Sequence, residues 1–157
     1  MTLRDLTTLQ HAADCKKTSM RPDYVVKVKF TDNTANGLTK AVIAALKLHG
    51  CQAERVSVEG RVIDTRQRIN GRLIGEVKRI PSSGSRGSAD VSSTIPVTIG
   101  GHKLGISVKW EIKMKDDQSP DQVKYQEHIE QSGGHYFIVR SFEDFWDKYQ
   151  LVINKYR

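Results

Sequence analysis

Strict alternation of apolar and polar residues runs from Ile106 to Lys115. The apolar set is Ile106, Val108, Trp110, Ile112 and Met114, and the polar set is Ser107, Lys109, Glu111, Lys113 and Lys115. A period of two residues is that of a β-strand with one face in a core. Glu111 and Lys113 must therefore point to the same side of the predicted sheet.

Helical signals flank this strand. Between Thr34 and Gly50 the apolar residues follow the i, i+3, i+4, i+7 rule, which predicts a helix that packs across a sheet. The run 119–122, Ser-Pro-Asp-Gln, combines a capping serine, a first-turn proline and a capping-box glutamine, and predicts a helix to about Ser132. A last helix is expected from Ser141. It carries Phe142, Phe145, Trp146 and Tyr149, and the first three of these are expected in the core with Trp110.

Runs of β-branched and aromatic residues between turn residues predict the remaining strands. These are residues 24–30, a short pair at 55–58 and 61–63, a hairpin over 66–78 around Asn70-Gly71, residues 90–99, and residues 135–140. The nearly continuous apolar character of residues 135–140 favours an inner position in the sheet. This order of elements predicts a single mixed α/β domain over residues 23–157, preceded by a loose arm or short helix over residues 1–22.

Composition restricts where such a protein works. At 157 residues the chain can bury a real core without disulfide staples. Cys15 and Cys51 have no metal-type spacing and we expect no signal peptide, so a reducing, cytoplasmic environment is predicted. No apolar run approaches the length of a membrane span, which argues for a soluble protein without a membrane partner.

Positive charge is concentrated in one part of the chain. The formal net charge is +7, and residues 61–86 hold seven basic residues against the acids Asp64 and Glu76. The basic residues are Arg61, Arg66, Arg68, Arg72, Lys78, Arg79 and Arg86. Such a segment suits a polyanion, most simply nucleic acid, but an ordinary solvated basic surface explains the charge equally well.

An acid, Asp90, follows a glycine turn ahead of the alternating strand. Two carboxylates about 4 Å apart repel by roughly 4 kcal/mol at an effective dielectric near 20. A pair formed by Asp90 and Glu111 must therefore protonate, pair with Lys113 or hold a divalent cation. Oxygen ligands suit Mg²⁺ or Mn²⁺, and such an ion activates water that Lys113 can orient. The strand alone favours a plain solvated face, and a rival Glu-x-Lys triplet lies at 76–78.

Three runs of sequence together favour the metal site over the plain solvated face. They are GSADV at 87–91, VKWEIKMKDDQSPDQ at 108–122 and GGHYFIVRSFEDF at 133–145. In their order and content they resemble the VRR-NUC branch of the PD-(D/E)XK nuclease superfamily, over roughly residues 34–145. The resemblance implies a restriction-endonuclease-like mixed β-sheet flanked by helices. It also implies a Mg²⁺- or Mn²⁺-dependent DNA endonuclease, similar to Holliday-junction resolvases, that acts on branched or junction DNA, often as a homodimer.

The resemblance also assigns roles to single residues. Asp90 and Glu111 become metal ligands together with the backbone carbonyl of Ile112, Lys113 becomes the catalytic lysine, and Gln122 becomes an active-site residue that competes with its own capping role. The expected DNA contacts are the seven basic residues of 61–86 and Lys115.

The first helix departs from the pattern of the family. Relatives usually carry an acid there, whereas residues 34–50 contain no Asp or Glu. Asn36 is nearest to that place and Asp32 lies just before the helix, so each is a possible substitute. A binding-only member of the superfamily, with the fold but without the metal, is the alternative.

Overall fold

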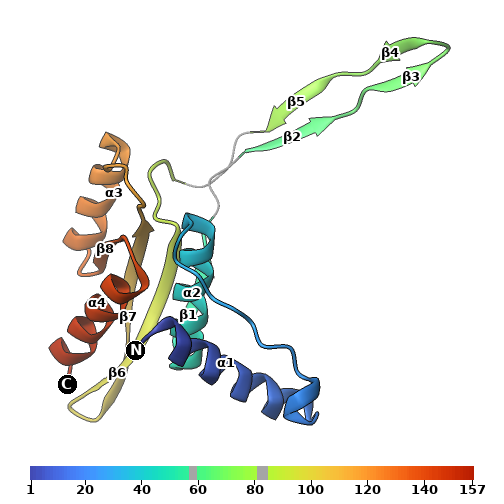
Figure 1. The fold of residues 1–157 in the computed structure, drawn as a ribbon. Coiled ribbons are helices and arrows are strands. Elements are labelled where there is room, and N and C mark those ends of the chain that lie inside the picture. The colour runs from blue at the N-terminus through green and yellow to red at the C-terminus, as the bar shows by residue number, and fades with distance from the viewer. Residues whose placement is uncertain (57–59, 81–84) are drawn as a thin grey trace.

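A four-stranded sheet, in the order β1-β6-β7-β8, organises the fold (Figure 1). The computed structural model describes residues 1–56, 60–80 and 85–157. The strands are β1 (Gln52–Arg55), β6 (Val91–Ile99), β7 (His102–Ile112) and β8 (His135–Val139). β6 pairs antiparallel with both β1 and β7, while β8 runs parallel to β7. The chain is thus a single mixed α/β domain, as the sequence predicted.

The alternating stretch forms β7, the longest strand of the sheet. It is joined to β6 through Gly100 and Gly101, which both have positive φ. The strand starts earlier than the alternation suggests and ends at Ile112 instead of Lys115. It ends there because β8 stops at Val139, whose carbonyl accepts the N–H of Lys113 at 3.0 Å.

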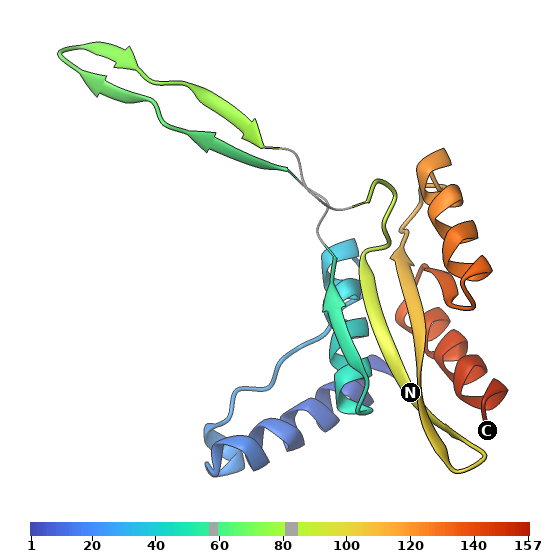
Figure 2. The same ribbon diagram turned by 180° about the vertical axis from the view of Figure 1, so that it is seen from behind.

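Four α-helices pack around the sheet in the described residues (Figure 2). They are α1 (Leu3–Thr18), α2 (Ala35–Leu48), α3 (Pro120–Gln131) and α4 (Phe142–Lys155). Thr34 caps α2 and Gly50, at φ 75°, follows its end, while α3 begins with the predicted capping box. In the described part of the chain, no helix is long and apolar enough to cross a membrane.

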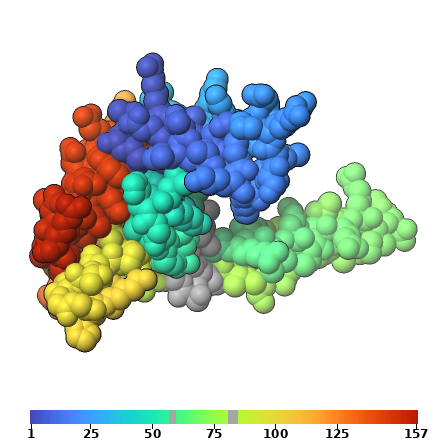
Figure 3. All heavy atoms as spheres, turned by 90° about the horizontal axis from the view of Figure 1, so that it is seen from below, coloured from blue at the N-terminus to red at the C-terminus, as the bar shows by residue number. Residues whose placement is uncertain are grey.

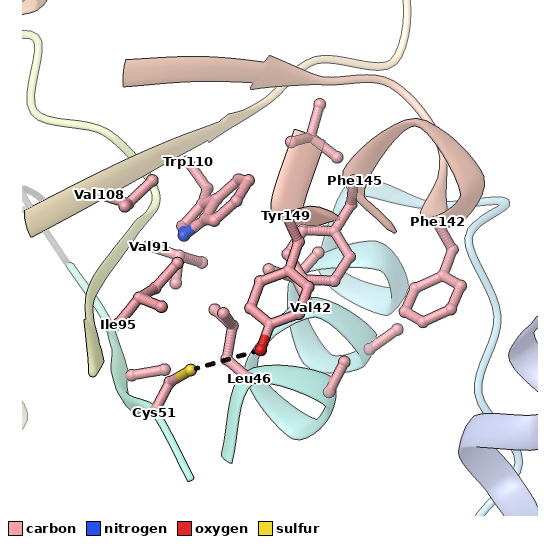
Figure 4. Close-up of a cluster of buried hydrophobic side chains, with 14 of the residues drawn as sticks. Val42, Leu46, Cys51, Val91, Ile95, Val108, Trp110, Phe142, Phe145 and Tyr149 are labelled. Atoms are coloured by element: carbon pink, nitrogen blue, oxygen red, sulfur yellow. Dashed lines mark hydrogen bonds between the residues drawn. The ribbon is translucent and has the colours of Figure 1, made fainter. Parts of the chain in front are cut away.

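The core fills the space between α2, α4 and one face of the sheet (Figure 4). Trp110 lies at its centre, fully buried, with its ring 4.9 Å from that of Phe145 in an edge-on arrangement. Phe142 is also buried and Trp146 is half-buried at the margin, so the aromatic residues pack as the sequence predicted. Cys51 is buried near Tyr149, and both Cys15 and Cys51 are free thiols.

The N-terminal segment is a helix of 16 residues that contributes to this core. Thr2 and Asp5 form a capping box at its start, and Leu6 is fully buried. Of the two forms expected for residues 1–22, the helix is therefore the one observed.

The predicted strand at residues 24–30 is wrong. Pro22–Tyr24 is a single 3₁₀ turn, and Tyr24 and Val26 are 72% and 84% exposed. A strand needs a neighbour to take its backbone hydrogen bonds, and none of the described strands pairs with this segment. Only Phe30 packs against the core.

Two predictions of strand neighbours are also wrong. β8 lies at an edge of the sheet rather than inside it. Its residues are apolar on both faces because Val139 faces the core while Tyr136, on the other face, packs against Tyr125 of α3. Of the pair expected at 55–58 and 61–63, the described residues pair elsewhere: Arg55 pairs with Val91, and residues 61–63 pair with residues 78–80. Residues 57–59 of that prediction lie outside the described residues.

Residues 61–80 form a long two-stranded ribbon, called the ribbon below, that extends away from the sheet (Figures 1 and 3). Its strands are β2 (Arg61–Asp64), β3 (Gln67–Ile69), β4 (Arg72–Ile74) and β5 (Val77–Ile80), with β2 paired to β5 and β3 to β4. Asn70 and Gly71 both have positive φ, as the predicted turn requires. The ribbon is longer than the predicted hairpin because Thr65 N–H donates to Glu76 O and joins its two halves.

Ser93→Ala should lower the free energy of unfolding by about 1–3 kcal/mol, because it leaves a buried N–H without an acceptor. In the wild type, Trp110 Nε1 donates to Ser93 Oγ at 2.8 Å. Ser92→Ala is the matched control, since Ser92 accepts instead from the partly exposed Lys109 and its loss should cost less. Urea denaturation of both variants measures the difference, and equal losses would contradict this role for Ser93.

Candidate active site

The two predicted acids meet at one end of the sheet. Asp90 immediately precedes β6, and Glu111 is the second-last residue of β7. β6 and β7 pair Val91 with Trp110, so the next position places Asp90 opposite Glu111. Directly opposed residues have Cβ atoms about 4.5–5.5 Å apart. Because Trp110 points into the core, the neighbouring Glu111 points to the other face of the sheet.

The Glu111 carboxylate is almost completely buried, with 3% of the residue exposed. Its Oε1 accepts from Gln122 Nε2 at 2.5 Å and lies 3.3 Å from Lys113 Nζ, whose side chain is 16% exposed. Its Oε2 accepts from the Tyr136 hydroxyl at 3.3 Å. A carboxylate offers about four acceptor positions, so these donors leave room for one further ligand.

Burial raises the pKa of Glu111 above its ordinary value, and the negative charge of Asp90 raises it further. Lys113 and Tyr136 lower this pKa but do not cancel the rise. Burial, followed by the charge of Glu111, also raises the pKa of Tyr136 well above its usual range. Tyr136 is therefore a neutral donor at physiological pH. The site holds a carboxylate that is costly to ionise, beside a lysine.

Gln122 caps α3 and contacts Glu111 with the same side chain. Its amide oxygen accepts from Ser119 N at 2.9 Å, which closes the capping box of α3, while its amide nitrogen donates to Glu111. The sequence suggested that the two roles compete. They do not, because they use opposite ends of one side-chain amide.

The side chain and the main-chain carbonyl of Asp90 each accept a hydrogen bond from a backbone N–H. Its Oδ2 accepts from Ile112 N at 2.9 Å, and its carbonyl oxygen accepts from Val56 N at 2.8 Å. Ile112 thus contributes an N–H to the site, and its carbonyl stays a predicted metal ligand. Asp90 Oδ1 makes no hydrogen bond to the described residues.

The two possible first-helix substitutes have other partners. Asn36 Oδ1 accepts from Arg55 at 2.9 Å, and Asp32 accepts from Phe142 N at the start of α4 at 3.1 Å. Within residues 1–56, 60–80 and 85–157, no three His, Cys, Asp or Glu side chains gather as a metal centre. Two carboxylates nevertheless suit Mg²⁺, which keeps several waters and is often held by one or two carboxylates. The residues present fit such an ion.

The predicted DNA contacts lie outside this cluster. Six of them are on the ribbon, Arg86 is exposed just before Gly87, and Lys115 is exposed beyond β7. Arg66 forms an ion pair with Asp64 at 2.7 Å. The rival triplet at 76–78 is on the exposed ribbon, where its side chains face solvent, and it is the weaker candidate.

Sequence reasoning missed Tyr136 and Gly87. Tyr136 reaches Glu111 only because β8 runs parallel to β7, and no local pattern specifies that pairing. Gly87 has φ 76°, and a Cβ there would lie 2.4 Å from the carbonyl carbon of Asp121. The chain before Asp90 thus passes directly over the first turn of α3, which carries Gln122. Its signal in the sequence was the glycine of GSADV.

Comparison of the chain with protein-family models, with curated proteins and with solved structures found no match. The geometry around Glu111 therefore carries the functional argument.

Gly87→Ala should disturb the site more than Gly133→Ala, although both glycines have nearly the same positive φ. Each alanine pays backbone strain of about 1 kcal/mol, but only the Cβ at Gly87 meets a backbone neighbour, since nothing lies within 4 Å of that at Gly133. Gly87→Ala should therefore unfold at a lower temperature and shift the amide resonances of Asp121 and Gln122. Thermal unfolding and NMR measure both effects, and equal behaviour of the variants would contradict the close approach.

Glu111→Gln should gain stability relative to the wild type as pH rises. A carboxyl whose pKa is higher in the folded state favours that state only while protonated, so the wild type loses stability as pH rises from 4.5 through the raised pKa. The glutamine does not titrate. Urea denaturation between about pH 4 and pH 8 measures the difference. Glu54→Gln, on the exposed side of β1, is the control, and a Glu111→Gln variant that loses stability relative to the wild type as pH rises would contradict the raised pKa.

Proposed function

We propose that the protein is a Mg²⁺- or Mn²⁺-dependent nuclease that hydrolyses DNA phosphodiester bonds at Asp90, Glu111, Lys113 and Gln122. The observation that carries this proposal is the buried Glu111 carboxylate, opposite Asp90 and in contact with both Lys113 and Gln122. These are the residues that the resemblance to PD-(D/E)XK nucleases selects.

A purely structural role explains this cluster less well. Removing a carboxylate from water costs several kcal/mol, and apolar residues of similar size often stabilise a fold better. Buried titratable groups with perturbed pKa values concentrate at functional sites. The cluster also lies where β6 begins and β7 ends, and Asp90 Oδ1 makes no hydrogen bond among the described residues.

Asp90, Glu111 and the carbonyl of Ile112 would hold the cation. When bound, such an ion supplies Lewis-acid activation of water and charge stabilisation at the phosphate. Lys113 can donate to the attacking water or to a phosphate oxygen, because its ammonium is already held beside Glu111. Gln122 and Tyr136 fix the carboxylate from its two oxygens, which preserves the orientation that catalysis requires.

A binding-only module is the second candidate. It is favoured by the first helix, where Asn36 and Asp32 are bonded elsewhere and add no further carboxylate to the pair. Branched or junction DNA as the substrate, a homodimer as the active form and a cytoplasmic location are further proposals that come from the resemblance and the composition.

The proposal is tested by incubating plasmid, linear duplex, flap and four-way-junction DNA with Mg²⁺, Mn²⁺ or EDTA. The wild type should cleave only with metal. Glu111→Gln and Lys113→Ala should each reduce the rate about a hundredfold or more, while Glu76→Gln, in the rival triplet, should leave it unchanged. Cleavage retained by Glu111→Gln would move the site elsewhere, and a wild type that cuts nothing under Mn²⁺ would favour the binding-only module.

A further inference from the structure

The ribbon has no core of its own and gains none from the domain. Every residue of its four strands is exposed except Ile63, which is half-buried. Its exposed aliphatic residues include Val62, Ile69, Leu73, Ile74, Val77 and Ile80. A two-stranded ribbon alone is marginally stable in water. Twenty residues in this state suggest that a partner covers them.

The pairing across the ribbon shows what kind of partner fits. Each of its seven cross-strand pairs joins one aliphatic residue to one polar or charged residue, as in Val62 with Arg79 and Arg68 with Leu73. Successive pairs point to opposite faces, so both faces carry aliphatic and polar side chains together. Neither face is the continuous apolar surface that another protein or a second copy would cover.

The net positive charge of the ribbon favours a polyanionic partner. The ribbon contains six basic and two acidic residues and so holds four of the seven net positive charges of the chain. Among the described residues, Arg66 is the one ribbon cation in an ion pair. The other five are available to phosphates.

We infer that the ribbon lies in the major groove of duplex DNA, an inference that rests on DNA being the substrate of the proposed function. The major groove is about 12 Å wide and admits a two-stranded β-ribbon. Ten residues per strand at about 3.3 Å each span roughly 33 Å, close to one turn of duplex. Basic residues on both faces can approach the phosphates on both sides of the groove, and the aliphatic side chains can contact thymine methyl groups.

The base of the ribbon connects this contact to the candidate active site. The ribbon is inserted between β1 and β6, and the chain on its two sides is joined by the hydrogen bond from Val56 N to Asp90 O. Asp90 is thus both a candidate metal ligand and the anchor of the ribbon. The chain on either side of the ribbon therefore meets at the end of the sheet that carries Glu111.

The test uses full-length Glu111→Gln protein in EDTA, so that cleavage cannot interfere with binding. The probes are a 30-base-pair DNA duplex, one of its single strands and an RNA duplex of the same sequence. The DNA duplex should bind best, because a single strand has no groove and the major groove of RNA is too narrow for side chains to read. Methyl green, which occupies the major groove, should displace the protein, whereas the minor-groove ligand distamycin should not.

Matched charge removal tests the ribbon itself. Arg68→Gln with Arg72→Gln removes two charges near its tip, and Lys16→Gln with Lys17→Gln removes two from the end of α1. The ribbon variant should reduce the slope of log affinity against log salt by about 1.8, from about 0.9 per phosphate contact, and the α1 variant should not. All four residues are exposed, and circular dichroism checks that the fold is kept.

Equal salt slopes for the two variants, displacement by distamycin alone, or equal binding of the single strand or the RNA duplex would overturn the inference. These results are separable from the proposed chemistry. A wild type that cuts DNA while the ribbon variant keeps its salt slope refutes the groove contact alone. A wild type that cuts nothing but binds DNA through the ribbon refutes the nuclease alone.

Discussion

The buried carboxylate of Glu111 is the interaction on which this end of the molecule depends. An ionised group removed from water needs donors close by, and here they come from three elements: Lys113 after β7, Tyr136 on β8 and Gln122 on α3. Asp90 adds a second negative charge opposite them. The ends of two strands and the start of a helix must therefore be in register before the carboxylate is satisfied, which couples the local fold to the site.

Local sequence signals predicted the helices, strands and turns well, but predicted poorly which strands pair with each other. Alternation located β7, the capping box located α3, and Asn70-Gly71 located the turn of the ribbon, because each depends on residues close in the chain. The edge position of β8 and the unpaired residues 24–30 depend on which strands meet, and no short stretch encodes that. A strand that is apolar on both faces has the same kind of sequence whether it lies inside a sheet or at its edge.

The residues of the candidate site likewise fall into those that the sequence identified and those that it did not. The sequence singled out Glu111 and Lys113 as a triplet on the alternating strand behind the acid Asp90, and the family resemblance selected these residues and added Gln122. The β6–β7 hairpin and the start of α3 bring them together. Tyr136 was not found, because its approach to Glu111 requires the parallel crossover through α3. The double use of Gln122 was also hidden, since a one-letter pattern does not reveal that the two ends of an amide can serve two partners.

The single hydrogen bond from Val56 to Asp90 has a consequence for how such a protein can change over evolution. This bond joins the chain before the ribbon to the chain after it. The pairing of β1 with β6 therefore does not depend on the length of the chain between these two residues. Doubling the length of a flexible excursion costs only about 0.6 kcal/mol. Insertions and deletions can therefore remodel the surface that meets a partner while the carboxylates stay in place. In the proposed nuclease, DNA recognition and chemistry could therefore diversify at different rates.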